Sequence, residues 1–107
     1  MSPYIRKRDK GICISCGNKR PYKEQNAGHF VHNKMDFNEK NINCQCVHCN
    51  KWLKGNLGWY AVNLDLKWGK DTAQKLLKKG KSIVAEKYTL SELNRLIKKY
   101  KTKLEKL

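Results

Sequence analysis

The chain is short and strongly basic. It has 107 residues, with 24 Lys plus Arg against 9 Asp plus Glu, for a formal net charge of +15. This length allows one domain with at most a helical extension. A hydrophobic content of 39% supplies only a small core, which usually needs a staple such as a metal. The excess positive charge predicts a polyanionic partner, nucleic acid before an acidic membrane surface.

Two classes of protein are disfavoured by the composition. No apolar run approaches the roughly 18 residues of a membrane-spanning helix, and no apolar stretch follows the basic start as in a signal peptide. We therefore expect no membrane insertion. Without an export signal, the five cysteines are interpreted as reduced thiols and metal ligands, not as disulfides.

The N-terminal segment predicts a basic arm followed by a cysteine knuckle. The arm spans residues 1–10, and its cations can follow a phosphate backbone: they are Arg6, Lys7, Arg8 and Lys10. The knuckle spans residues 11–17 and contains Cys13 and Cys16, with Gly17 suited to the backbone turn that a knuckle requires.

Two short strands are predicted on either side of a loop. The first spans residues 26–32, the loop residues 33–40, and the second residues 41–46. Cys44 alternates with Cys46 along the second strand. We interpret Cys44 as a buried core thiol, because a free cysteine behaves as a small hydrophobic residue. A spare metal ligand is the alternative.

Helices account for most of the remaining chain. A short helix begins at the second cysteine pair and ends at Gly55, and a second spans residues 56–68 with one apolar stripe. A third spans residues 72–79, between a capping Asp71 and a terminating Gly80.

The last helix is the most clearly predicted element. It follows residues 81–88, which suit either a strand or an extended linker, and it starts with a Thr89–Glu92 capping box. Its apolar stripe has helical spacing and comprises Leu90, Leu93, Leu96, Ile97, Tyr100, Leu104 and Leu107. The stripe suits a homodimer contact or docking element, or packing back onto the chain's own core.

Four cysteines form two Cys-x-x-Cys pairs with metal-binding spacing. Each pair lets two thiolates hold one tetrahedral ion from a single turn. Together the pairs predict one structural Zn²⁺ held by Cys13, Cys16, Cys46 and Cys49.

Three polar side chains near these pairs are candidates for chemistry. A metal-dependent nuclease needs a base to deprotonate water and a divalent ion to stabilise charge on the phosphate. His29 is the candidate base, and a core or zinc-proximal histidine is the alternative. Asn41 and Asn50 can each fix a loop or offer a carbonyl oxygen to a hard cation, although caps and turns are the commoner uses of asparagine.

The order of these residues resembles the zinc-braced ββα-metal, or HNH, nucleases. Cys-x-x-Cys is followed by Gly-His, Asn, and then Cys-x-x-Cys-Asn, an ending similar to that of endonuclease VII-type junction resolvases. Over roughly residues 8–70 the chain resembles the phage recombination endonuclease family called NinG or Rap. The motifs that carry this resemblance are Cys13 to Gly17, Ala27-Gly28-His29-Phe30, Phe37 to Asn41, Gln45 to Asn50, and Gly55-Asn56-Leu57.

The resemblance implies a fold and a site. The fold is α+β, with a small zinc-stabilised, treble-clef-like HNH core in residues 1–70 and C-terminal helices in residues 71–107. In the site, His29 is the general base, Asn41 fixes the loop, and Asn50 is a ligand to a catalytic Mg²⁺ or Mn²⁺. The implied activity is a structure-selective DNA endonuclease on branched recombination intermediates, such as Holliday junctions or D-loops, in the cytoplasm of a bacterial host.

Gly28 departs from the wider HNH pattern, in which a carboxylate or histidine ligand often precedes the base. Asn26, Asp36 or substrate phosphates are the candidates to complete the metal shell. A non-catalytic zinc-ribbon protein that binds DNA or RNA is the alternative function, and Gly28 favours it.

Further contacts with DNA are predicted from charge and aromaticity. Lys51 and Lys54 lie on the knuckle helix beside Asn50, where a scissile phosphate would sit, and lysine contributes charge with little base specificity. The chain has three tryptophans, Trp52, Trp59 and Trp68, which suit a core or dimer contact or stacking on unpaired bases.

Overall fold

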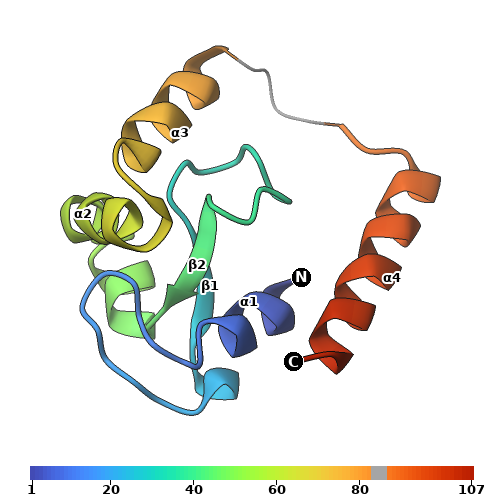
Figure 1. Ribbon diagram of the computed structural model, residues 1–107, viewed down its shortest axis with the longest axis horizontal. Helices are drawn as coiled ribbons and strands as arrows, with labels where there is room; N and C mark the ends of the chain where they lie inside the picture. The colour runs from blue at the N-terminus through green and yellow to red at the C-terminus, as the bar shows by residue number, and fades with distance from the viewer. Residues whose placement is uncertain (83–86) are drawn as a thin grey trace.

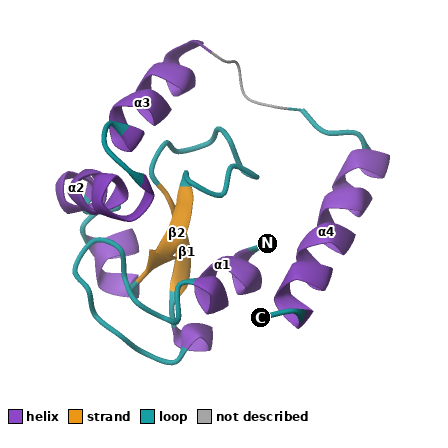
Figure 2. Ribbon diagram, viewed as in Figure 1, coloured by secondary structure: helices purple, strands orange, loops and turns teal. Residues whose placement is uncertain are grey.

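The computed structural model describes residues 1–82 and 87–107, in which helices surround one pair of short strands (Figures 1 and 2). The fold is therefore of the predicted α+β class. In chain order the elements are α1 (Ser2–Arg8), the 3₁₀ turn η1 (Tyr22–Glu24), β1 (Asn26–His29), β2 (Ile42–Gln45), the π-helical turn η2 (His48–Trp52), α2 (Leu57–Trp68), α3 (Thr72–Ser82) and α4 (Leu90–Glu105).

The two strands pair antiparallel, and both are shorter than predicted. Asn26 lies opposite Gln45, and His29 lies opposite Ile42. Beyond the ladder, the N–H of Phe30 still donates to the main-chain carbonyl of Asn41 at 2.8 Å, and main-chain pairing stops at the next residue. The N–H of Val31 donates to the Oδ1 of Asn41 at 2.8 Å, instead of to a main-chain carbonyl.

The core lies between the strand pair, the following loop and helices α2 and α3. Its buried residues are Ile14, Phe30, Met35, Tyr60, Leu64, Ala73 and Leu76. The rings of Phe30 and Tyr60 are 5.3 Å apart. The Tyr60 hydroxyl donates to the carbonyl of Gly28 at 2.6 Å, so the core is tied directly to β1. This bond satisfies a polar group that would otherwise be costly to bury.

The N-terminal basic arm is helical. Residues 2–8 form α1, which is anchored by a fully buried Ile5. Arg8 is drawn inward as well, because its guanidinium donates to the carbonyls of Glu39 and Ile42 and to Asp9. A seven-residue helix is too short for its apolar period to be read, and tertiary contacts stabilise it.

The third helix corrects two predictions. α3 continues through Gly80 to Ser82, whereas Gly80 was predicted to end it. Glycine is needed there for packing, because a Cβ on Gly80 would come within 2.9 Å of a methyl group of Val31. Asp71 does occupy the position before the helix, where its main-chain carbonyl accepts from the N–H of Lys75 at 3.0 Å, but its side chain does not cap the first turn. The Oδ1 of Asp65 in α2 accepts from the N–H of Ala73 at 3.0 Å and so satisfies a free donor of the first turn.

The last helix packs against α1 on the far side of the strand pair from α3 (Figure 1). The predicted capping box of Thr89 and Glu92 is confirmed. Only Tyr100 of the apolar stripe is buried, and Leu90 and Ile97 remain exposed. The helix therefore packs back onto the chain itself, against α1 and not against the core cluster, while a homodimer stays a prediction. The expected strand or linker at residues 81–88 falls partly outside the described residues.

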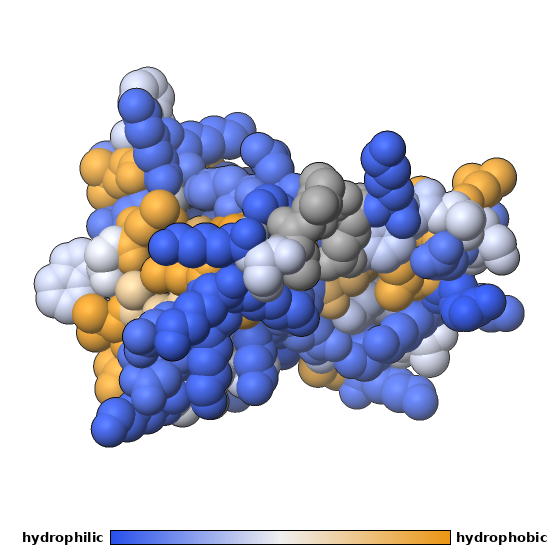
Figure 3. Space-filling view, turned by 90° about the horizontal axis from the view of Figure 1, so that it is seen from above, coloured by the Kyte–Doolittle hydropathy of each residue, from blue (hydrophilic) through white to orange (hydrophobic). Residues whose placement is uncertain are grey.

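Two surface properties follow from the composition. Hydrophilic residues predominate on the face drawn in Figure 3, with smaller apolar patches among them. Within residues 1–82 and 87–107, no helix combines the length and apolarity needed to cross a membrane.

Candidate functional site

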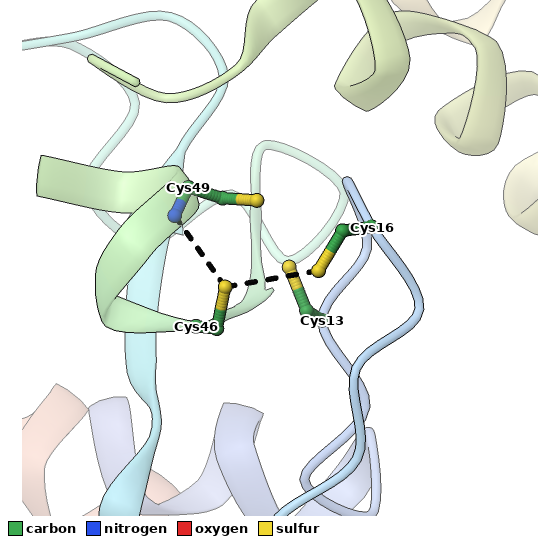
Figure 4. Close-up of side chains that lie close together, drawn as sticks. All are labelled: Cys13, Cys16, Cys46 and Cys49. Atoms are coloured by element: carbon green, nitrogen blue, oxygen red, sulfur yellow. Dashed lines mark hydrogen bonds between the residues drawn. The ribbon is translucent and has the colours of Figure 1, made fainter. Parts of the chain in front are cut away.

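Four sulfur atoms from the two predicted knuckles converge on one point (Figure 4). The Sγ atoms of Cys13, Cys16, Cys46 and Cys49 all lie within 4.8 Å of one another. The Sγ atoms of Cys16 and Cys46 are 3.7 Å apart. A tetrahedral Zn²⁺ with Zn–S bonds of about 2.3 Å requires sulfur pairs about 3.8 Å apart. The donor set and its spacing therefore fit a structural zinc ion.

Local backbone geometry builds each knuckle. Gly17 has a φ of +78°, which L side chains rarely adopt, and its N–H donates to the carbonyl of Cys13 at 2.8 Å. In the second knuckle, the N–H of Cys49 donates to the Sγ of Cys46 at 3.4 Å. The side-chain amide of Asn56 donates to the Sγ of Cys49 at 3.5 Å. Such donors offset thiolate charge and orient the ligands.

The thiols of the chain differ in acidity. Burial raises the pKa of Cys46, but hydrogen bonds from Cys49 and neighbouring thiols outweigh it and hold that pKa below its usual value. Burial raises the pKa of Cys49 to about 12, and it raises the pKa of Cys44 to about 12 as well. Cys44 is fully buried and outside the sulfur cluster, as predicted for a core thiol.

Unpartnered buried polar atoms gather along β1. Four such atoms occur in the described residues, and all belong to β1, to the residue before it or to its partner strand: Gln25 Oε1, Asn26 Nδ2, His29 Nε2 and Gln45 Oε1. Buried polar atoms normally have partners, and exceptions call for a ligand, an ion or water. This strand is therefore the candidate functional site.

His29 ends β1 and is partly open to solvent. Its Nε2 lies 3.2 Å from the Oδ1 of Asp36, a residue of the loop between the strands. The side chain of His29 is 31% exposed and that of Asp36 is 55% exposed, whereas the Nε2 atom of His29 is itself shielded from solvent. Solvent therefore reaches Asp36 and the rest of the imidazole ring. The sequence analysis proposed His29 as the base and Asp36 as a possible metal ligand, but it did not predict a contact between them.

Asn41 holds the loop that follows His29. Besides its bond to Val31, its Nδ2 donates to the carbonyls of Val31 at 3.1 Å and Lys34 at 3.3 Å. Asn41 itself is fully buried. These contacts are those expected of a loop-fixing asparagine, and they constrain the segment between His29 and Asp36.

Asn50 lies against the strand residue that precedes His29. Its Oδ1 is 3.1 Å from the position that a Cβ on Gly28 would occupy. It is carried by η2, where the N–H of Leu53 donates to the carbonyl of His48 at 2.9 Å. Single π-helical turns are rare and often occur at functional sites. The zinc-type knuckle thus positions Asn50 beside Gly28.

Gln45 is the residue of this site to which the sequence gave no role. It directly precedes Cys46 and was visible only as part of a longer motif. A Cβ on Gly28 would overlap its Oε1. The juxtaposition arises from pairing between distant strands, so no local signal reveals it.

The predicted DNA-binding cations have different environments. Lys51 and Lys54 are exposed beside Asn50. Arg6 donates to the carbonyls of Lys23 and Gln25, and Arg8 is 13% exposed and bound internally, so Arg8 is a structural residue. A groove of about 610 Å³ is lined by the cations Lys7, Arg8, Lys10, Lys19 and Arg20.

The tryptophans also separate into two groups. Trp68 is half-buried against the core. Trp52 and Trp59 are 77% and 62% exposed, so the prediction of a core position is wrong for these two. Trp52 follows Asn50 by two residues in η2, and its indole is open to solvent.

These features define a small α+β protein with a four-cysteine cluster suited to zinc. The family model for the bacteriophage lambda NinG protein matches residues 1–107. The chain belongs to this NinG family, which confirms the predicted family while its nuclease assignment stays a prediction.

Curated relatives come from several phages. The NinG protein of Escherichia phage lambda is 31% identical over 112 residues, which cover 100% of this chain and 53% of the relative. The NinG protein of Salmonella phage P22 is 39% identical over 69 residues, covering 60% of this chain and 34% of the relative. The chain spans about half the length of the lambda relative. No solved structure matches it.

Proposed function

We propose that the protein is a metal-dependent DNA endonuclease with a zinc-braced HNH core. The observation that carries this proposal is the contact of His29 with Asp36 at the end of β1, with Asn50 against the preceding residue, Gly28. Buried polar atoms without hydrogen-bond partners lie along the same strand and its neighbours. The order of motifs agrees with it. The proposed substrate is branched DNA of the kind formed in recombination. The lambda relative is about twice as long as this chain, so this substrate is proposed only for the region that the two proteins share.

In this proposal His29 removes a proton from the attacking water. The oxygen then attacks phosphorus, and the bond from phosphorus to the leaving oxygen breaks. Asp36 orients the imidazole, and Asn41 keeps the loop between them in place. A bound Mg²⁺ or Mn²⁺ would neutralise charge on the phosphate and leaving oxygen, with the Asn50 oxygen as one ligand.

The surface charge supports a nucleic-acid substrate. The net charge is +15, and Lys51 and Lys54, which follow Asn50 in the chain, are exposed. Lysine contacts to phosphate give affinity without base readout, so binding should fall steeply with salt. The exposed indole of Trp52 suits stacking on bases left unpaired at a branch point.

The test is cleavage of a four-way junction and a D-loop with Mg²⁺ or Mn²⁺, compared with a linear duplex. His29→Ala should lower the cleavage rate by about 100-fold or more, because it removes the base. The variant should keep its zinc content and circular dichroism spectrum.

His32→Ala is the matched control, since His32 is an exposed histidine of the loop that follows His29. It should cleave like the parent. Equal cleavage by His29→Ala and the parent would contradict the proposed role of His29, and EDTA-insensitive cleavage would contradict the role of the divalent ion.

A non-catalytic zinc protein that binds DNA or RNA is the second candidate. Gly28 favours it, because glycine has no side chain to ligate a catalytic ion. Binding of junction DNA at the affinity of structured RNA, with no cleavage under any metal, is the result that this candidate predicts.

A further inference from the structure

The side-chain amide of Gln45 has a fixed orientation. Gln45 is fully buried. Its Nε2 donates to the carbonyl of Gly55 at 2.7 Å and to the hydroxyl of Ser15 at 2.8 Å. A carbonyl accepts and cannot donate, so the nitrogen must face Gly55 and the oxygen must face the other way.

The other way is toward Gly28 and Asn50. The Oε1 of Gln45 occupies the space in which a Cβ on Gly28 would lie, and the Oδ1 of Asn50 is 3.1 Å from that same position. Two amide oxygens from different segments therefore flank one point on β1. The Gln45 oxygen has no hydrogen-bond donor.

Neither oxygen carries a formal charge, and each is a ligand type that hard divalent cations accept. A buried acceptor without a hydrogen-bond donor destabilises the fold unless something satisfies it. A cation would satisfy it, whereas an added side chain at residue 28 would displace it. The Gln45 oxygen can therefore occupy its position only because residue 28 has no Cβ.

We infer that Gln45 replaces the missing side-chain ligand of residue 28, so that its Oε1 and the Asn50 Oδ1 together bind the divalent cation. This inference rests on the proposed function, because it concerns the cation of that site. It also accounts for the glycine at residue 28, where the wider HNH pattern has a ligating side chain. The ligand comes instead from Gln45 on β2, the strand paired with β1. With neutral amide ligands, the affinity for the free ion should be weak.

Asn26 offers the competing account of the Gln45 oxygen. Asn26 lies directly opposite Gln45 in the ladder, and its Nδ2 is also unpartnered. A hydrogen bond between the two side chains would satisfy both without an ion. In that case, changes at Gln45 would leave cation binding unaltered.

The experiment is a Mn²⁺ titration of the zinc-loaded protein. Binding is measured as the loss of the electron paramagnetic resonance signal of free Mn²⁺. Gln45→Met keeps the side-chain length but removes the oxygen, and Gly28→Ala pushes the oxygen away. Each should weaken Mn²⁺ binding about tenfold or more. Gly58→Ala makes the same chemical change where no atom lies within 4 Å, and it should bind Mn²⁺ like the parent.

Zinc content and circular dichroism are measured for every variant, because the Gln45 amide also ties the knuckle to Ser15 and Gly55. If Gln45→Met loses zinc, the role of Gln45 is tested instead with the double variant Gly28→Asp with Gln45→Ala. It places a carboxylate in the vacated space. Mn²⁺ binding at or above that of the parent supports the inference, and binding tenfold weaker overturns it.

Asn50→Ala separates this inference from the proposed function. Weakened binding in Asn50→Ala, together with parental binding in Gln45→Met and Gly28→Ala, overturns the role of Gln45 and leaves the cation site standing. Parental binding in all three variants overturns both the Gln45 ligand and the placement of the cation. The junction-cleavage assay then judges the nuclease activity independently.

Discussion

Asp9 is the buried carboxylate that ties the N-terminal helix to the sheet. It accepts hydrogen bonds from Arg8 and Lys67, each at 2.7 Å, and from the N–H of Cys44 at 2.8 Å. Burial raises the pKa of Asp9, but these three donors outweigh burial and hold the pKa below its usual value. A depressed carboxylate pKa stabilises the fold above the unfolded-state pKa and stops doing so in acid.

We therefore predict that Asp9→Asn lowers the free energy of unfolding by roughly 2 kcal/mol near pH 7, because charged hydrogen bonds are lost. The difference from the parent should shrink as the pH falls below about 5 and through 4, where the unfolded-state carboxyl protonates. Urea denaturation between pH 3.5 and 7 measures it.

Because zinc release in acid is itself expected to unfold the protein, the comparison uses only those pH values at which both proteins keep their zinc. Asp71→Asn is the control, because Asp71 is exposed. A destabilisation by Asp9→Asn that stays constant across this pH range would contradict the ionic role of Asp9.

At the scale of elements, one glutamate of the loop between the strands holds α4. The carboxylate of Glu39 accepts from the hydroxyls of Tyr4 and Tyr100 at 3.2 and 3.1 Å and from the Nζ of Lys103 at 2.7 Å. Burial raises its pKa, but the hydrogen bonds from Lys103 and the tyrosines outweigh this and hold the pKa of Glu39 low. The rings of Tyr4 and Tyr100 are 5.5 Å apart beside it.

Glu39→Gln should loosen α4 without unfolding the zinc-braced core, because it weakens three contacts between the helix, α1 and the loop. Hydrogen exchange of amides in residues 90–105 should accelerate several-fold, while exchange in residues 57–68 stays at the parental rate. Glu105→Gln, an exposed acidic change within α4, is the control. Unchanged exchange in Glu39→Gln would show that aromatic packing alone holds the helix.

At the scale of the whole molecule, the core is too small to be expected to fold without its metal. The apparent free energy of zinc binding to such sites is on the order of 10–16 kcal/mol, which is comparable to the entire stability of a typical domain. The Sγ cluster joins two segments separated by 30 positions between Cys16 and Cys46, namely the pairs at residues 13–16 and 46–49.

Removing zinc should therefore unfold the protein. Purified protein should contain one zinc per chain, and a strong chelator should abolish the circular dichroism signal of the helices. Cys46→Ser should have the same effect, whereas His48→Ala, an exposed change inside the same knuckle, should retain zinc and fold. A chelated protein that keeps its cooperative thermal transition would contradict a structural role for zinc.

Elements with local signals were predicted well. The second helix was expected at residues 56–68 and is observed at Leu57–Trp68. The capping box at Thr89 was also predicted, because it depends on a side chain three residues away. Short elements stabilised from outside were missed: α1 forms around a buried Ile5, and Gly80 lies inside a helix because Val31 packs against it.

The spacing of residues near one another in the chain determined the two knuckles, the candidate histidine and the asparagine after the last cysteine. Such spacing is sufficient because each feature uses one or two turns of backbone. Tertiary structure alone decided that Asp36 reaches His29, that Gln45 turns its oxygen toward Gly28, and that Glu39 receives α4. These contacts join segments brought together by strand pairing and core packing, and no local pattern encodes the distances between them.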